Sequence, residues 1–312
     1  MPAVVIAPAY GGPEVLSVVD EPVPDPGPGE ARIEVRAAGV NPVDRKAYSG
    51  AFGADPDRLP IRLGSEAAGV VTATGPDAVG PAGPLAVGDE VIAFRASGAY
   101  AAELVVPAQA LVPKPSVLDW AQASGLMLTG ATAWHTLAAT GVTKGDTVLI
   151  HAATGGVGLM AVQLAVARGA MVVGTASPAR HELLRELGAV PVAYGDGLAD
   201  RVRAAAPGGI DAALDLIGTD EAMDVSLALV PDRARIAAFA RGPQEGIKVL
   251  GGGPGADPGT EIRDAARLEL ARLAQDQAVR VFVTRTYPLA DVADAHREIM
   301  TGHTTGKIAL IP

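Results

Sequence analysis

The chain has 312 residues, of which 49% are hydrophobic and 19% charged, a composition typical of a globular protein and long enough for two domains. Its net charge of −10 at neutral pH disfavours nucleic acid and anionic membrane surfaces as partners. Because the sequence contains no cysteine, disulfides, thiolate catalysis and cysteine-ligated zinc are excluded.

Residues 1 to about 115 contain short strands separated by sharp turns. The N-terminal MPAVVIAPAYGG lacks the basic start and long apolar core of a signal peptide. EARIEVRAAGV (residues 30–40) alternates polar and apolar residues, as a half-buried strand does, and the proline-rich segment before it predicts a loop. GDEVIAF, YAAELVVP and ALVPKP continue the pattern. This part of the chain predicts a small β-barrel or sandwich.

The pattern changes near Val117. SVLDWAQASGLMLTGATAWHTLAAT (residues 116–140) is helix-like along its length. Near-continuous apolar strands then alternate with helices, as in TVLIHA, AMVVGTAS, VPVAY, IDAALDLIG and ARIAAFA. Such strands are buried on both faces, which predicts a doubly wound parallel sheet of the dinucleotide-binding type.

The tail, residues 278–312, reads as strand, helix, strand. Such an ending either caps the parallel sheet or returns to the first domain. No apolar run along the chain reaches the roughly 18 residues of a membrane span, so we expect no membrane partner. The absence of cysteine fits a cytoplasmic protein, and we expect that location.

The stretch HAATGGVG (residues 151–158) follows the apolar run TVLI. Ala153-x-Gly155-x-x-Gly158 has the spacing of a dinucleotide-binding turn, with Ala in the first position. Gly155 lets the backbone approach a pyrophosphate, and Gly158 lets the helix pack close to the strand. The helix N-terminus favours bound phosphates. We predict a nucleotide site over an ordinary turn, with contacts from Thr154, Gly155, Gly156, Val157 and Gly158.

The end of the second strand indicates which nucleotide binds. An NAD site needs an acidic residue about 20 residues after the glycines. Here GTASPARHE offers Ser177, Arg180 and His181, with no carboxylate before Glu182. Arg180 can form charge-assisted hydrogen bonds to a 2′-phosphate, and the alternative is an ordinary surface arginine. The sequence therefore favours NADPH over NADH.

Several motifs occur in an order that resembles a known family: YGGPEVL, AAGVNPVDRKAYSG, LGSEAAGVV, LTGATAWHTL, HAATGGVG and PLADVADAHREIMTGHTTGKIAL. The chain resembles the medium-chain dehydrogenase/reductase superfamily, in its zinc-free quinone oxidoreductase branch. The resemblance implies a GroES-like catalytic domain at residues 1–116 and 281–312 and a Rossmann NADPH-binding domain at 117–280. It also implies a homodimer, for which GIKVLGG is a plausible edge strand.

The zinc-dependent branch of that superfamily holds its catalytic zinc with two cysteines, or a cysteine and a similar residue, and the histidine of a G-H-E motif. The matching positions here are Asn41, Ser65 and a residue near Leu128, which do not form a zinc ligand set. The histidines are scattered and are expected to be packed or on the surface: His135, His151, His181, His296 and His303. We therefore expect no metal.

The resemblance also implies roles for single residues. Asn41 is the expected contact of the nicotinamide ribose and faces the substrate, with a turn before Pro42 as the alternative. Tyr48 is a candidate proton or hydrogen-bond donor, or else a packed aromatic. Further cofactor contacts are expected at positions that also allow capping, solvated or structural roles: Thr132, Tyr194, Ile217, Gly218, Phe239 and Lys307.

Without a Lewis acid, a simple ketone is a difficult hydride acceptor, whereas a quinone or enone spreads the developing charge over a conjugated system. We therefore expect NADPH-dependent reduction of a quinone or conjugated carbonyl. The alternatives are an enone or 2-alkenal reductase of a biosynthetic pathway, and a non-catalytic NADPH-binding sensor. No nucleophile motif such as G-x-S-x-G supports hydrolysis.

Overall fold

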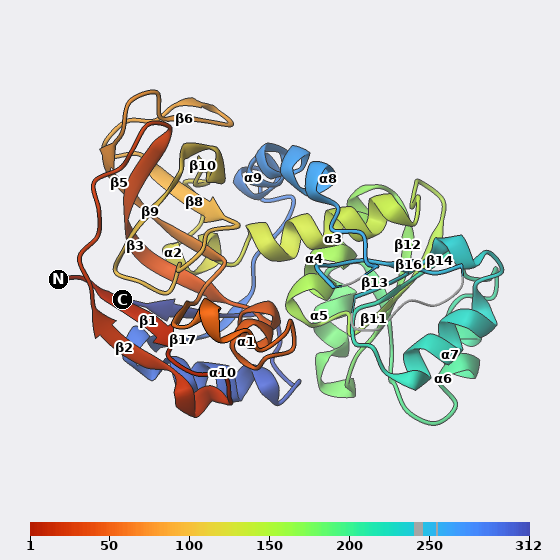
Figure 1. Ribbon diagram of the computed structural model, residues 1–312. Coiled ribbons are helices and arrows are strands. Elements are labelled where there is room, and N and C mark those ends of the chain that lie inside the picture. The colour runs from red at the N-terminus through yellow and green to blue at the C-terminus, as the bar shows by residue number, and fades with distance from the viewer. Residues whose placement is uncertain (240–245, 254) are drawn as a thin grey trace. The chain divides into compact units, whose positions relative to one another are not determined.

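The computed structural model describes residues 1–239, 246–253 and 255–312. They form two compact units (Figure 1). Unit 1 comprises Met1–Leu128 and Arg267–Pro312, and unit 2 comprises Thr129–Ala266. In the described ranges, no helix has both the length and the apolar character needed to cross a membrane.

Unit 1 is mainly β-structure, as the short strands of the sequence predict. Its seven-stranded sheet has the order β10-β8-β5-β3-β18-β17, and β9 also pairs with β3. A second sheet has the order β2-β1-β4, and β6 and β7 form a hairpin. The strands are β1 (Ala3–Ala7), β2 (Ser17–Asp20), β3 (Glu30–Val40), β4 (Ile61–Arg62), β5 (Glu66–Thr74), β6 (Val79–Gly80), β7 (Gly83–Pro84), β8 (Glu90–Phe94), β9 (Glu103–Pro107), β10 (Leu111–Pro113), β17 (Val283–Pro288) and β18 (Lys307–Ile311).

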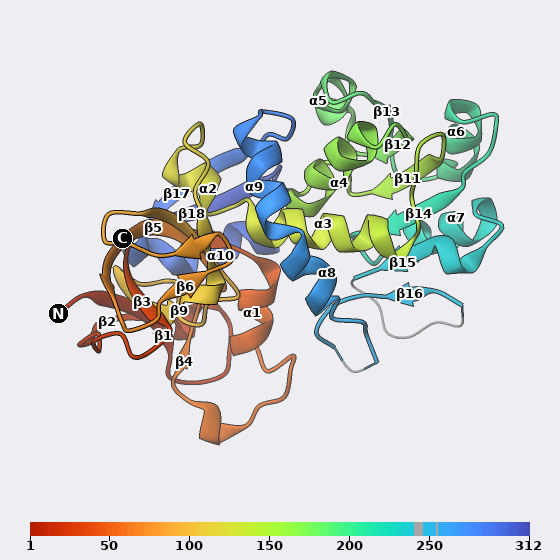
Figure 2. The same cartoon turned by 90° about the horizontal axis from the view of Figure 1, so that it is seen from above.

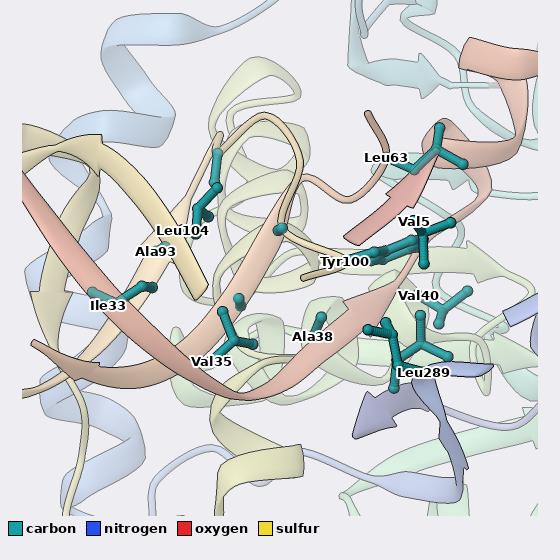
Figure 3. Close-up of a cluster of buried hydrophobic side chains, with 14 of the residues drawn as sticks. Val5, Ile33, Val35, Ala38, Val40, Leu63, Ala93, Tyr100, Leu104 and Leu289 are labelled. Atoms are coloured by element: carbon teal, nitrogen blue, oxygen red, sulfur yellow. The ribbon is translucent and has the colours of Figure 1, made fainter. Parts of the chain in front are cut away.

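The helices of unit 1 are short. They are α1 (Pro42–Tyr48), α2 (Trp120–Ala123), α9 (Arg267–Gln275) and α10 (Val292–Met300), with single 3₁₀ turns at η1 (Pro13–Val15), η2 (Pro56–Arg58), η3 (Ala108–Ala110) and η6 (Leu289–Asp291). Apolar residues from β1, β3, β8 and η6 meet in one core cluster, including Val5, Ile33, Ala93 and Leu289 (Figure 3). In the first half of β3, every second residue enters this core, which is why its sequence alternates.

The C-terminal segment returns to the first domain instead of capping the parallel sheet. β18 pairs antiparallel with β3, with Ile308 opposite Val40 and Leu310 opposite Ala38. This register brings Lys307 beside Asn41, although the two residues lie 266 positions apart in the sequence. The strand pairing therefore assembles part of the candidate site described below.

Unit 2 contains the predicted doubly wound sheet, with all strands parallel in the order β13-β12-β11-β14-β15-β16. Figure 2 shows the same order from above, with β16 at one edge. Its elements are α3 (Met127–Ala139, which begins in unit 1), β11 (Thr147–His151), α4 (Gly156–Ala167), β12 (Met171–Thr175), η4 (Pro178–Arg180), α5 (His181–Glu186), β13 (Ala189–Val192), α6 (Leu198–Ala205), β14 (Ala212–Asp215), α7 (Asp220–Leu229), η5 (Arg233–Arg235), β15 (Ile236–Ala238), β16 (Lys248–Val249) and α8 (Thr260–Ala265).

The central strands of this sheet are buried on both faces, which explains their near-continuous apolar sequences. Leu149 and Val173 face one side and pack with Val202 of α6 and Met223 of α7. α4 packs on β11 and β12. The two layers of helices leave the ends of the strands as the accessible part of the sheet.

The helix-like segment 116–140 is two helices in the structure. α2 ends at Ala123 and α3 begins at Met127. Gly125 lies in the break, and a Cβ there would lie 3.1 Å from Cγ of Lys307 and 3.2 Å from Cγ1 of Val281. The absence of a side chain at Gly125 therefore leaves space for the lysine side chain. α2 packs against β3 and β5, and α9 packs against β10, so these flanking segments lie with unit 1.

Candidate functional site

The glycine-rich turn lies between β11 and α4, where the sequence predicts it. Its residue Ala152 has a positive φ of 53°, and its N–H donates to Oγ1 of Thr175 at 3.1 Å. The N–H of Ala153 donates to the carbonyl of the same threonine at 3.0 Å. The end of β12 thus fixes the turn from one side.

Two glycines of the turn have different surroundings. A Cβ on Gly158 would lie 2.2 Å from the carbonyl oxygen of Ala152 and 2.8 Å from Cα of Ala153, both backbone atoms. A Cβ on Gly155 would meet only the Ala152 oxygen, at an ordinary 3.4 Å. Gly158 is therefore required by the close approach of α4 to the turn, as predicted, whereas the protein itself has room for a side chain at Gly155.

The N-terminus of α4 is suited to an anion. Gly155 is the N-cap residue and supplies no side-chain cap to this twelve-residue helix. The first N–H groups of a helix have no intrahelical partner and lie at the positive end of its dipole. Thr154, Gly155, Gly156 and Val157 are partly exposed, while Gly158 is buried. These residues fit the pyrophosphate of a dinucleotide.

The turn after β12 brings Ser177, Arg180 and His181 together. Ser177 precedes η4, Arg180 is exposed at its end, and Nε2 of His181 lies 3.3 Å from the carbonyl oxygen of Ala176. The first carboxylate after them, Glu182, accepts from Arg185 at 3.1 Å. The charged group at the end of this strand is therefore a cation, which suits a phosphate.

The next predicted residues lie at the ends of β13, β14 and β15. Tyr194 is 55% exposed and Ile217 45% exposed, whereas Phe239 directly follows the buried end of β15. Sequence reasoning missed Asp215, a buried residue whose Oδ1 accepts the N–H of Ile217 at 3.1 Å and of Gly218 at 2.7 Å. An aspartate followed three residues later by glycine is the local signal of such a turn.

Thr132 lies in α3 and is 7% exposed. Its carbonyl accepts the hydroxyl of Thr136 at 2.7 Å, and Thr136 in turn accepts from Thr140 at 2.9 Å. These hydroxyls bond back to their own helix, which satisfies them without a partner from another element.

In unit 1, three residues from distant parts of the sequence form a buried polar network. Oε1 of Glu66 accepts from Nδ2 of Asn41 at 3.0 Å and from Nζ of Lys307 at 2.9 Å, while Oε2 accepts the N–H of Leu128 at 2.9 Å. Lys307 also donates to Oδ1 of Asn41 and to the carbonyl of Val40. A Cβ on Gly39 would lie 2.6 Å from Oε1 of Glu66, so this glycine leaves space for the carboxylate.

The orientation of the Asn41 amide follows from its partners. An ammonium can only donate, so Oδ1 faces Lys307, and a carboxylate can only accept, so Nδ2 faces Glu66. Nδ2 also donates to the carbonyl of Gly39 at 3.1 Å. Both amide hydrogens are thus used inside unit 1, and the remaining capacity of Asn41 is that of an acceptor.

Asp44 is a further residue that the sequence did not single out. Its Oδ2 accepts the N–H of Asn41 at 3.0 Å and the hydroxyl of Tyr100 at 2.8 Å, and its Oδ1 accepts from Ser65 at 2.8 Å. Burial raises the pKa of Asp44 to about 6, against the opposing effect of the hydroxyl donors. Asp44 thus fixes the backbone of Asn41, just as Glu66 fixes its side chain.

Tyr48 is fully buried, and its hydroxyl lies 2.9 Å from Nδ1 of His296. Burial raises the pKa of Tyr48 to about 12 and lowers that of His296 to about 4. The ring of His296 also meets the ring of Tyr100 edge-on at 5.8 Å. This part of unit 1 holds the tyrosine as a neutral phenol bonded to a neutral imidazole.

The three positions that match zinc ligands in other branches offer an amide, a hydroxyl and a backbone group. Asn41 and the N–H of Leu128 bond to Glu66, and Ser65 bonds to Asp44. Among residues 1–239, 246–253 and 255–312 there is no group of three His, Asp or Glu that could hold a metal ion. The cation at this place is the ammonium of Lys307.

Two family models match the chain. The model described as "Alcohol dehydrogenase GroES-like domain" covers residues 27–116, and "Zinc-binding dehydrogenase" covers 187–310. Together the two models identify the chain as an oxidoreductase of the dehydrogenase and reductase class.

A quinone oxidoreductase of Pseudomonas aeruginosa is 35% identical over 97% of this chain and 98% of its own length. The structure of Escherichia coli quinone oxidoreductase complexed with NADPH has a TM-score of 0.85 at 29% identity, over 99% of this chain and 100% of that chain. A mycobacterial structure complexed with NADPH has a TM-score of 0.86 at 33% identity, over the whole of both chains. The chain belongs to the medium-chain dehydrogenase/reductase superfamily, in its quinone oxidoreductase-like branch.

Proposed function

We propose that this enzyme is a zinc-independent NADPH:quinone oxidoreductase, which reduces a quinone or conjugated carbonyl by direct hydride transfer. The observation that carries the proposal is the N-terminus of α4, which has no side-chain cap and follows a tight glycine turn. At the end of β12, Arg180 then stands where an NAD site needs a carboxylate. The P. aeruginosa relative and the two NADPH complexes support the same assignment.

Different groups of the residues described above would bind different parts of the cofactor. The pyrophosphate would lie at Thr154, Gly155, Gly156, Val157 and Gly158, the 2′-phosphate at Ser177, Arg180 and His181, and the adenosine at Tyr194. The nicotinamide half would contact Thr132, Ile217, Gly218 and Phe239, and its ribose hydroxyl would donate to Asn41. Lys307 would act by holding Asn41, because its bonds to Val40, Asn41 and Glu66 use its three N–H groups.

When bound, the reduced nicotinamide supplies the hydride, and the chain's residues orient it and exclude water. Zinc independence is supported by the charge already present, since Lys307 neutralises Glu66 in a buried ion pair. The ammonium also occupies Oε1 of Glu66 and Oδ1 of Asn41, the oxygen atoms that could otherwise bind a metal ion. Water would supply the proton, because Tyr48 is fully buried against His296 and fits the packed-aromatic alternative.

The test is turnover of NADPH with a panel of quinones, enones and 2-alkenals, using protein treated with a strong chelator. Quinone reduction that survives the chelator is the expected result. Preference for enones or alkenals would favour the alternative reductase, and tight NADPH binding without turnover would favour a sensor. Comparable oxidation of a saturated secondary alcohol with NADP⁺, or loss of activity to the chelator, would overturn the proposal.

We also propose a cytoplasmic homodimer. Within the described residues, β16 pairs with β15 and is the edge strand of its sheet, and such an edge is a template for a second copy. On the outer side of β16 the carbonyl of Val249 already accepts the N–H of Asp257 at 2.8 Å, so a symmetry mate would pair with the part of the strand before Val249. A monomeric mass in solution at micromolar concentration would contradict this. The functional division into residues 1–116 with 281–312 and residues 117–280 likewise remains a proposal.

A further inference from the structure

The loop that follows β13 is held by a single side chain. Residues 193–197 connect β13 to α6, with positive φ values of 97° at Gly195 and 78° at Gly197. Arg201 donates from Nε to the carbonyl of Ala193 at 2.9 Å, from Nη2 to that of Gly195 at 2.7 Å, and from Nη1 to that of Asp196 at 2.6 Å. One guanidinium thus binds three carbonyls of the same short loop.

The position of Arg201 in α6 is not explained by the helix itself. α6 begins at Leu198, so this cation lies near the positive end of the helix dipole, where a negative charge is preferred. Arg203, two residues later, is an ordinary surface residue whose side chain pairs with Asp200 at 2.8 Å. The difference between these arginines indicates that Arg201 serves the loop and not the helix.

The loop carries the exposed Tyr194 and lies beside the turn that carries Arg180. β12 and β13 are parallel with Thr175 opposite Val192, and the N–H of Ala176 donates to the carbonyl of Val192 at 3.0 Å. Both loops therefore leave the carboxyl edge of the sheet at neighbouring points. Within unit 2, an aromatic ring and an arginine are brought to one stretch of that edge.

We propose that Arg201 is a positioning residue for the adenosine half of the cofactor. By binding three loop carbonyls it keeps the ring of Tyr194 in place before the ligand arrives. The entropy cost of ordering the loop then does not weaken ligand binding. The adenine and its ribose 2′-phosphate would then lie against Tyr194, with Arg180 on the phosphate. This inference rests on the proposed NADPH function and assigns Arg201 to one half of that ligand.

The experiment compares Arg201→Met with Arg203→Met, a matched removal of an arginine from the same helix. Two fragments of the cofactor are used as probes: 2′,5′-ADP for the adenosine half and reduced nicotinamide mononucleotide for the other. For Arg201→Met we expect the Kd of 2′,5′-ADP and of NADPH to rise about tenfold or more. Its kcat/KM with reduced nicotinamide mononucleotide should equal that of the wild type, and Arg203→Met should be unchanged in every measurement.

A general structural role would weaken both fragments alike, and that result would overturn the inference, as would unchanged binding of 2′,5′-ADP. If Arg201→Met does not fold, Arg201→Lys is judged by the same criterion, because it keeps the charge but not the three-way geometry. Failure of the wild type to bind 2′,5′-ADP would instead refute the NADPH assignment itself.

Discussion

Gly155 and Gly158, at the start of α4, allow structural and ligand-binding roles to be separated by one pair of substitutions. Gly158→Ala would place a Cβ 2.2 Å from the carbonyl oxygen of Ala152, a distance that must grow to about 3.4 Å. Gly155→Ala creates no contact shorter than 3.4 Å, and its φ of −71° suits alanine. The first change disturbs the protein, and the second disturbs only the space where a pyrophosphate is proposed.

The magnitudes follow from these surroundings. Overpacking costs about 1–3 kcal/mol, and the upper end applies at Gly158 because its neighbours are backbone atoms that cannot rotate away. Replacing a helical glycine by alanine returns up to about 1 kcal/mol. The net loss at Gly158 is therefore about 2 kcal/mol. At an unfolding entropy of about 2.1 cal/mol/K per residue, this lowers Tm by about 3 °C when all 312 residues unfold together. At Gly155 the loss of a favourable N-cap residue costs less than about 1 kcal/mol.

Thermal unfolding followed by circular dichroism, together with NADPH titration, gives the two readouts. Gly155→Ala should keep a near-wild-type Tm and lose at least about tenfold in NADPH affinity, because its methyl group occupies the path of the pyrophosphate. Gly208→Ala is the control, since a Cβ there meets nothing within 4 Å. A Gly158→Ala protein as stable as the wild type would refute the steric reasoning. A Gly155→Ala protein with full NADPH affinity would show that this turn does not bind the cofactor.

Three other predictions concern single side chains. Arg180→Ala should weaken the binding of NADPH by about 10- to 150-fold and leave the binding of NADH unaffected, because it removes a charge-assisted hydrogen bond worth about 1.5–3 kcal/mol. Equal losses of affinity for both cofactors in parallel titrations would show that Arg180 does not select NADPH. Tyr48→Phe removes the partner of His296, so we expect a loss of about 1–3 kcal/mol in chemical denaturation with kcat nearly unchanged, whereas a fall in kcat of about 100-fold would establish the tyrosine as proton donor. Burial lowers the pKa of His151 to about 4. Between pH 6.5 and about 4, the unfolded chain therefore binds a proton at this histidine and the folded chain does not. The contribution of neutral His151 to the free energy of unfolding is present above pH 6.5 and decreases by about 2 kcal/mol down to pH 5. His151→Gln should remove that part of the pH dependence. An unchanged pH profile of stability would contradict this prediction.

The fold could be predicted from the sequence because its signals are local. Alternation along β3 and apolar runs at β11, β12 and β14 report burial on one face or on two, whatever the rest of the chain does. The pairing of the C-terminal segment, residues 278–312, with β3 was one of two open possibilities. A strand–helix–strand pattern does not indicate which sheet its strands will join. The close approach of Lys307 to Gly125, in the break between α2 and α3, is a contact across the sequence that no local pattern reveals.

The candidate site was predictable in its glycine turn and much less so in unit 1. Asn41 and Lys307 were identified singly by resemblance, but their common partner Glu66 joins them across 25 and 241 positions of sequence. Asp44 gave no signal either, because an aspartate early in a helix is usually only a cap. The properties of these groups depend on the hydrogen bonds between them. The pairing of β3 with β5 and β18 brings them together, and the sequence does not state that register.

The pairing of Glu66 with Lys307 also has a consequence for the order in which the protein is made. Glu66 leaves the ribosome 241 residues before the lysine that neutralises it. At the usual 5–20 residues per second, that interval is about 12 to 50 s. During this time the strand that begins at Glu66 cannot bury its carboxylate without leaving an uncompensated charge. All of unit 2, residues 129–266, is synthesised within the same interval and is free to fold first. Unit 2 can therefore fold before unit 1, because unit 1 is complete only when β18 has been synthesised and pairs with β3.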